Sequence, residues 1–119
     1  MKNLSYGKPY PLRKVIEEIA LIVKEGEFSD WNYDLYSDSE PEILDAELQC
    51  YLEEGPSISD DDEEQYPDFV TRNNLNWIYS GQQLEDVIMN AYSQNPKATT
   101  LQIIEGLNYY SKFDTFKEI

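Results

Sequence analysis

The sequence predicts an α+β fold, in which about three helices pack with a small antiparallel sheet to form a single domain over residues 1–119. Three observations support this expectation. Apolar residues recur at helical spacing near both ends of the chain, they alternate at a spacing of two near its middle, and no repeat or linker divides the sequence. With 40% hydrophobic residues, a chain of this length can build one core.

The helices have the clearest signals. The first is expected at about residues 11 to 25, where one stripe of apolar side chains repeats at i, i+3, i+4, i+7, i+8 and i+11. Two later helices are indicated by capping boxes, in which Ser or Thr is followed three residues later by Gln. The capping pairs are Ser80 with Gln83 and Thr99 with Gln102. These helices are expected to end at Asn95-Pro96 and at about Tyr110, and an apolar tail is expected to dock on the core: Phe113, Phe116 and Ile119.

The sheet is expected in the middle of the chain. Residues 44–52 alternate apolar and polar side chains, which predicts a half-buried strand with Cys50 pointing inward. The β-branched and aromatic residues of 68–79 predict one or two short strands that pair with residues 44–52. Residues 27–42 show no sustained period, so they are interpreted as a loop with room for a short strand near Tyr33 to Tyr36.

The acidic residues are concentrated in one segment. Residues 25–68 hold seventeen of the 24 acidic residues and none of the nine Lys and Arg residues, in a chain of net charge −15. Within this segment, Gly55-Pro56 predicts the end of a strand, and an exposed acidic loop at about residues 56–67 follows. Self-repulsion of this kind destabilises a compact state, so a function is expected to retain it, although solubility alone is the alternative explanation.

Large aromatic residues are interleaved with the acids, which is the composition of a protein interface. Direct nucleic-acid binding and an anionic membrane surface are disfavoured because both require Lys and Arg. The natural partner is therefore a basic protein. The expected contacts are five carboxylates at Asp60, Asp61, Asp62, Glu63 and Glu64, and four anchoring rings with one neighbouring acid at Trp31, Tyr33, Asp34, Tyr36 and Tyr66.

Enzyme chemistry is not expected. The chain has no histidine, its single Cys50 has no basic neighbour in the expected strand, and no glycine-rich phosphate loop is present. A calcium site is the rival interpretation of the acidic strip, but the strip lacks the glycine and the alternating ligands of a helix-loop-helix calcium loop. No cofactor is expected. One cysteine and the lack of a signal or membrane-spanning run predict a cytoplasmic protein. A monomer or a weak dimer is expected.

Two stretches of the second half, WIYSGQQLEDVIMNAYSQNP (77–96) and LNYYSKFDTF (107–116), resemble the small acidic immunity proteins of bacterial contact-dependent growth inhibition. The resemblance implies a cytoplasmic protein that binds one cognate toxin tightly, often a nuclease acting on tRNA. The expected function is therefore to cover the basic cleft of such a toxin with an acidic, aromatic-rich surface. The alternative is an acidic nucleic-acid mimic or adaptor, of the anti-restriction or anti-CRISPR type, outside toxin systems.

Overall fold

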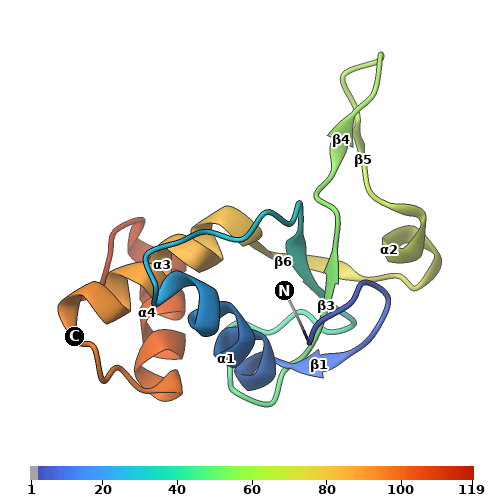
Figure 1. Cartoon of the computed structure of the whole chain (residues 1–119). Helices are drawn as coiled ribbons and strands as arrows, with labels where there is room; N and C mark the ends of the chain where they lie inside the picture. Colours follow the sequence, from blue (N-terminus) through green and yellow to red (C-terminus); the bar gives the residue numbers. More distant parts are fainter. Residues whose placement is uncertain (1–2) are drawn as a thin grey trace.

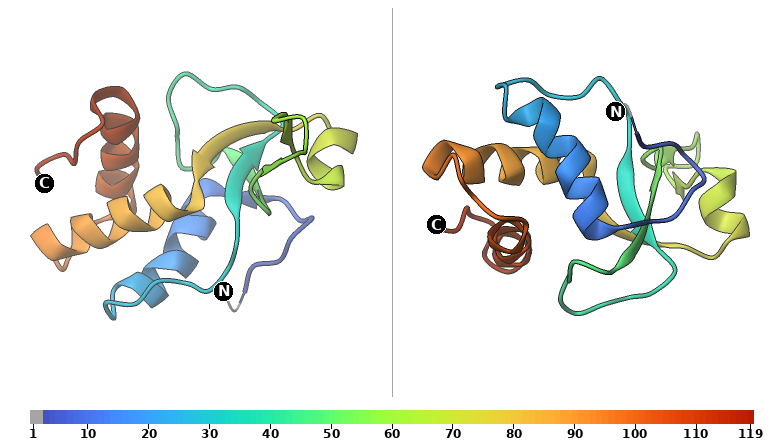
Figure 2. Two further views of the ribbon diagram at one scale, coloured as in Figure 1. Left: turned by 90° about the horizontal axis from the view of Figure 1, so that it is seen from above. Right: turned by 60° about the horizontal axis from the view of Figure 1, so that its bottom comes forward.

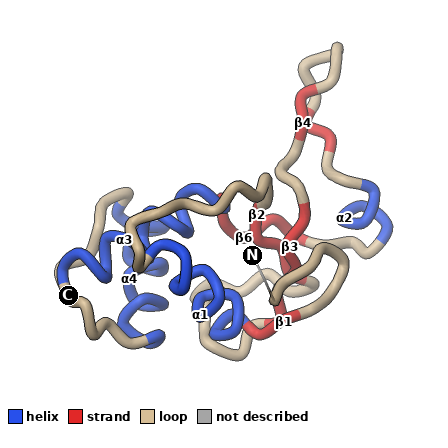
Figure 3. Tube along the Cα trace, viewed as in Figure 1, coloured by secondary structure: helices blue, strands red, loops and turns tan. Residues whose placement is uncertain are grey.

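A four-stranded antiparallel sheet, in the order β1-β3-β2-β6, lies at the centre of the computed structural model, which describes residues 3–119. Its strands are β1 (Tyr10–Pro11), β2 (Asp34–Ser37), β3 (Gln49–Glu53) and β6 (Asn76–Ser80). Two short strands, β4 (Ser57–Ile58) and β5 (Glu64–Gln65), form a separate hairpin. The helices are α1 (Leu12–Val23), α2 (Asp68–Arg72), α3 (Gly81–Gln94) and α4 (Thr100–Phe113), as Figure 3 shows. The predicted α+β class is confirmed.

Helices α1, α3 and α4 pack on one another and lie together on one side of the sheet (Figures 1 and 2). These are the three helices predicted from the sequence. The side chain of Ser80 accepts a hydrogen bond from the Gln83 N–H at the start of α3, and Thr99 with Gln102 forms a complete capping box at the start of α4. The last helix continues three residues beyond the expected end at Tyr110. Local periodicity and caps therefore determined these elements.

The two faces of the sheet are covered by different parts of the chain. On the helix side, Leu35 and Leu52 lie directly opposite one another and belong to the main hydrophobic core. On the other side, Tyr36 lies opposite both Tyr51 in β3 and Trp77 in β6. Since directly opposed residues of antiparallel strands share a face, these three rings form a row across the sheet, here called the aromatic face.

The strand predicted over residues 44–52 is shorter than expected and shifted toward its C-terminal end. Only Gln49–Glu53 forms β3. The preceding carbonyls are used elsewhere: the carbonyl of Ala46 accepts from the Arg13 N–H, and that of Leu48 accepts from the Leu12 N–H. These N–H groups belong to the first turn of α1 and have no partner within the helix, so the carbonyls of Ala46 and Leu48 are used to satisfy them and not to extend the strand. Cys50 does point into the core, as predicted.

The prediction that residues 68–79 pair with residues 44–52 is wrong. Pro67 stands at the N-cap of the short helix α2, and its carbonyl accepts from the N–H groups of Val70 and Thr71. After α2, Asn74 adopts the left-handed φ of 52° and turns the chain into β6. Strand β6 then pairs with β2 instead of β3, which places β6 at an edge of the sheet.

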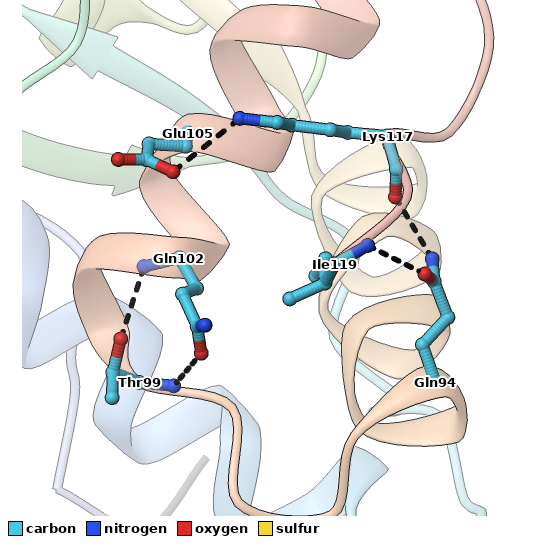
Figure 4. Close-up of polar contacts among 6 residues, drawn as sticks. All are labelled: Gln94, Thr99, Gln102, Glu105, Lys117 and Ile119. Atoms are coloured by element: carbon cyan, nitrogen blue, oxygen red, sulfur yellow. Dashed lines mark hydrogen bonds and ion pairs between the residues drawn. The ribbon is translucent and has the colours of Figure 1, made fainter.

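The C-terminal tail is held by polar contacts, so the prediction that its apolar residues dock on the core is wrong. The three apolar side chains remain exposed: Phe113, Phe116 and Ile119. The side chain of Gln94 donates to the carbonyl of Lys117 and accepts from the Ile119 N–H, and Lys117 pairs with Glu105 at 3.4 Å (Figure 4). The tail is thereby fixed against α3 and α4, and Phe116 packs on Tyr110 with ring centroids 5.2 Å apart while it stays 41% exposed.

Candidate interaction surface

The acidic strip forms the tip of the β4–β5 hairpin, which projects away from the rest of the molecule (Figure 1). It is exposed, as the sequence predicts, but it is a hairpin and not an irregular loop. Ser57 pairs with Gln65 and Ile58 with Glu64. Beyond these pairs, Ser59 closes the turn through both its N–H and its carbonyl.

The turn consists of three consecutive aspartates. The Asp62 N–H donates to the Ser59 carbonyl at 3.0 Å, and the Ser59 N–H donates to the Glu63 carbonyl at 2.9 Å. Asp62 has a φ of 60°, so the loop Asp60–Asp62 is a type I turn followed by a left-handed residue. This is a standard hairpin geometry, and Asp is one of the few residue types that adopts the left-handed conformation readily. Backbone hydrogen bonds therefore fix the turn, and its three aspartate side chains are exposed.

The hairpin carries its charge without neutralisation. Within residues 3–119, the ion pairs join Arg13 to Glu47, Lys14 to Glu18 and Lys117 to Glu105, and none of them involves the hairpin. The five acidic side chains of the tip and the returning strand are all exposed: Asp60, Asp61, Asp62, Glu63 and Glu64. Five carboxylates on a projecting arm produce a strong local negative potential that attracts basic groups.

The foot of the hairpin rests on the aromatic face. Tyr66 meets the ring of Tyr36 edge-on, with ring centroids 6.2 Å apart and planes at 85°. Phe69, in α2, packs on Tyr51 in a tilted arrangement, with ring centroids 5.7 Å apart and planes at 51°. Tyr66 stays exposed at the surface, and its hydroxyl donates to Glu64. Among the predicted anchoring rings, Tyr66 is therefore the one that stands beside the acidic strip and remains accessible.

Tyr36 and Tyr33, two of the predicted anchoring rings, are buried in this structure and are not accessible to a partner. Tyr36 is 0% exposed because Tyr66 covers it, and its hydroxyl donates to the Glu54 carbonyl at 2.9 Å. Tyr33 is 4% exposed, and its hydroxyl donates to Glu85 Oε2 at 2.6 Å. Burial and the hydrogen bond to Glu85 raise the pKa of Tyr33 far above its ordinary value. Both rings support the surface from beneath.

Asp34 and Trp31 lie near the start of α3 and not on the hairpin. The carboxylate of Asp34 accepts from the indole N–H of Trp77 at 2.9 Å and from the Gly81 N–H at 3.0 Å, so it fixes β6 and the first turn of α3. Trp31 is half-buried, and its ring lies 5.2 Å from that of Tyr6. Both residues line a cavity of about 450 Å³ that also contains Glu85. The structure thus separates them from the acidic tip.

Trp77 is an exposed ring that the sequence analysis did not select. It stands in the row with Tyr36 on the aromatic face and is 45% exposed. Its exposure follows from its position on the edge strand of the sheet. That position depends on the pairing of β6 with β2, for which the sequence offers no local signal.

The single cysteine and the acidic side chains are the remaining groups with possible chemistry. Burial, with smaller contributions from Asp45 and Asp38, raises the pKa of Cys50 to about 12, so its thiol is a poor nucleophile near neutral pH. In the part of the chain that the structure describes, no three His, Cys, Asp or Glu side chains are grouped to hold a metal ion. No helix between residues 3 and 119 is long and apolar enough to cross a membrane.

Comparison with known proteins gives one family. A family model described as a domain of unknown function (DUF7716) matches residues 10–119. No curated protein and no solved structure matches the chain significantly.

Proposed function

For this chain, which belongs to the DUF7716 family, we propose a role as an immunity protein that binds and neutralises a basic toxin domain. The toxin in this proposal is a nuclease that acts on RNA, with tRNA as the favoured substrate, and the complex forms in the cytoplasm. The observation that carries the proposal is the projecting hairpin: five exposed carboxylates without a cationic partner, held on a regular turn over an aromatic base.

The shape of the hairpin favours insertion into a cleft. A nuclease cleft is lined with Lys and Arg because it holds phosphates, and carboxylates can occupy the same positions. The charges would accelerate association by steering, while a ring at the foot of the hairpin, Tyr66, would slow dissociation. Trp77, exposed on the same face of the sheet, is the second candidate ring.

The toxin as partner rests on the resemblance of residues 77–96 and 107–116 to immunity proteins of contact-dependent growth inhibition. The second candidate function is that of an acidic nucleic-acid mimic or adaptor outside toxin systems. A mimic of nucleic-acid shape requires acids at regular spacing over an extended surface. Here the excess of acids is confined to residues 25–68, and five of these acids lie together on the hairpin, which favours the plug.

The test is protection from the toxin. Immunity genes lie beside the gene of their toxin, so the product of the neighbouring gene is expressed in a sensitive host, with and without this protein. We expect growth arrest by the neighbour alone and rescue by the wild-type chain. A variant with residues 60–64 changed to Asn or Gln is expected to rescue poorly.

The matched control carries the same change in net charge outside the hairpin. Five exposed acids without recorded ion pairs are replaced by Asn or Gln: Glu17, Glu25, Glu27, Asp30 and Glu118. This variant is expected to rescue like the wild type. A neighbouring product that is harmless by itself contradicts the toxin–immunity proposal, and equal rescue by both variants contradicts the role of the hairpin.

A further inference from the structure

A second surface lies at the opposite edge of the sheet from β1. Here a groove of about 810 Å³ runs between the loop of residues 40–44, strand β6 and helix α4. The side chain of Asn108 in α4 holds the loop, because it donates to the Leu44 carbonyl at 3.0 Å and accepts from the Leu44 N–H at 2.8 Å. The loop of residues 40–44, which forms one wall of the groove, is therefore fixed to α4.

The groove follows the backbone edge of β6. Side chains of a strand alternate between the faces of a sheet, so a groove on one face is lined by every second residue. Here three consecutive residues line it: Trp77, Ile78 and Tyr79. Strand β6 is an edge strand, and no backbone hydrogen bond recorded for residues 3–119 joins it to a strand on its outer side. Its outward N–H and C=O groups are a template for another strand.

Exposed apolar side chains gather at this edge. Ile43, on the loop, is 70% exposed, and Trp77, on the strand, is 45% exposed. Ile78 and Tyr109 are half-buried and complete the apolar lining. Single exposed apolar residues are ordinary on a protein surface, but a group that lines a groove beside an open strand edge is a feature of peptide-binding sites.

The charge of the groove indicates which occupant fits. The loop wall carries Glu40 and Glu42, neither of which has an ion pair in the described structure. On the α4 side, Lys117 is already paired with Glu105 at 3.4 Å, and Lys112, whose ammonium lies 5.4 Å from the centre of the Phe113 ring, also lines the groove, so the excess acidic charge belongs to the loop wall alone. A second copy of a chain with net charge −15 would be repelled on approach. An extended segment that alternates basic and apolar side chains matches both the acidic wall and the apolar lining.

We propose that this groove binds an extended segment of a basic protein, which adds to the open edge of β6 as a fifth strand. Backbone hydrogen bonds would provide affinity, and the pocket lined by Ile43 and Trp77 would accept an apolar side chain of that segment. The extra residue at Ile78, where the pairing with β2 shifts its register, limits the usable edge to a short stretch. The basic character of the partner rests on the proposed function; the existence of the strand-binding edge does not.

A synthetic peptide tests the edge directly. The probe is a capped seven-residue peptide that alternates lysine and valine, titrated into the isotope-labelled protein with backbone amide resonances as the readout. We expect shifts at residues 76–79 and 43 and slower hydrogen exchange of the outward amides of β6. The control peptide has the same sequence with two adjacent central amides methylated, which blocks strand pairing without changing charge. It is expected to lose the β6 shifts.

Two protein variants complete the test. Ile43→Asn removes an apolar contact from the groove and is expected to weaken peptide binding roughly fivefold. Leu21→Asn is the matched control, because Leu21 is 67% exposed on α1, outside the groove, and should leave binding unchanged. Shifts confined to residues 57–65, or equal binding of the methylated peptide, would overturn the inference while leaving the hairpin proposal intact. Conversely, the peptide could bind at β6 while the variant with residues 60–64 neutralised still protects cells fully from the toxin. That result would contradict the hairpin proposal and leave the strand-binding edge intact.

Discussion

The Tyr33 hydroxyl donates a 2.6 Å hydrogen bond to Oε2 of Glu85, a residue 52 positions later in the chain and 4% exposed. Ser29 donates to the same carboxylate through its N–H at 2.8 Å and its hydroxyl at 2.6 Å. Three neutral donors thus hold a buried carboxylate and fasten the segment before β2 to α3. A buried charge without a cation is tolerated only when its hydrogen bonds are complete.

Tyr33→Phe should therefore destabilise the protein by about 1–3 kcal/mol, because it leaves the Glu85 carboxylate one donor short. Urea denaturation at neutral pH measures the change. Tyr109→Phe is the control, because this half-buried ring packs on Phe113 and its hydroxyl has no hydrogen bond within residues 3–119, so the effect should be small. Equal stability of the two variants would show that the buried carboxylate does not need the phenol.

Glu53→Gln should stabilise the protein at neutral pH by a few degrees in melting temperature. Burial, together with repulsion from Glu54, raises the pKa of the Glu53 carboxyl, while the hydrogen bond from the Gly7 N–H opposes this in part. Because the pKa of Glu53 is higher in the folded state than in the unfolded state, ionisation of its carboxyl lowers the free energy of unfolding at pH values above the folded-state pKa.

The sign of this effect gives its pH dependence. As the pH falls through the folded-state pKa of Glu53 toward its unfolded value near ~4.3, the wild type takes up the proton and the advantage of Gln should vanish. Melting curves of both proteins between pH 4 and 7 measure the difference. A difference that is constant with pH would contradict the role of ionisation.

Gly81→Ala and Gly106→Ala should have opposite effects. A Cβ at Gly81 would collide with the carbonyl oxygen of Tyr33, which is backbone and cannot move aside, so a loss of about 3 kcal/mol is expected. A Cβ at Gly106 would meet Val87 Cγ1 at an ordinary 3.5 Å, so the better helix propensity of Ala should stabilise α4 by up to about 1 kcal/mol. Denaturant midpoints measure both. Two losses of equal size would contradict this packing.

Neutralising residues 60–64 should slow association with the toxin more than it accelerates dissociation, because exposed charges act mainly by steering. The association rate of the wild type should fall steeply between low and physiological salt, where screening shortens to ~8 Å, and that of the variant should be nearly flat. Stopped-flow binding measures both, with the five-acid control variant alongside. An unchanged salt slope in the neutral hairpin variant would identify the strip as a solubility device.

Tyr66→Ala should act on dissociation instead. The ring is exposed next to Glu64 and covers Tyr36, so its loss is expected to weaken the complex by about 2 kcal/mol or more if it anchors the partner. Trp31→Ala tests the other predicted ring that remains partly accessible. An effect of Trp31→Ala alone would move the interface to the cavity near the start of α3.

The sequence was sufficient for the helices because their signals are local. The stripe from Leu12 to Val23 and the capping pair of Thr99 with Gln102 lie within single elements, and the structure reproduces them. The strand pairing was not predictable in this way. Trp77 is positioned by the pairing of β6 with β2, in which it lies opposite Tyr36, 41 residues earlier in the chain. Nothing in the local pattern selects β2 over β3 as the neighbour of β6.

The candidate site shows the same limit. The exposure of the acidic strip followed from its composition, since nothing could neutralise Asp60 to Glu64 locally. The burial of Tyr33 and Tyr36 depends on Glu85 and Tyr66, which approach them only in the folded molecule. A ring beside acids has the same sequence pattern whether it faces a partner or lies under the surface.

The central position of β2 has a consequence for synthesis on the ribosome. Leu35 pairs with Leu52 on one side and with Tyr79 on the other, 44 residues downstream. Until Tyr79 has left the exit tunnel, β2 keeps an open edge, and α1 lacks the helices α3 and α4 that cover it. The nascent chain therefore exposes apolar surface late into translation, while its acidic middle segment, which has already been synthesised, carries a negative charge that repels other copies of the chain.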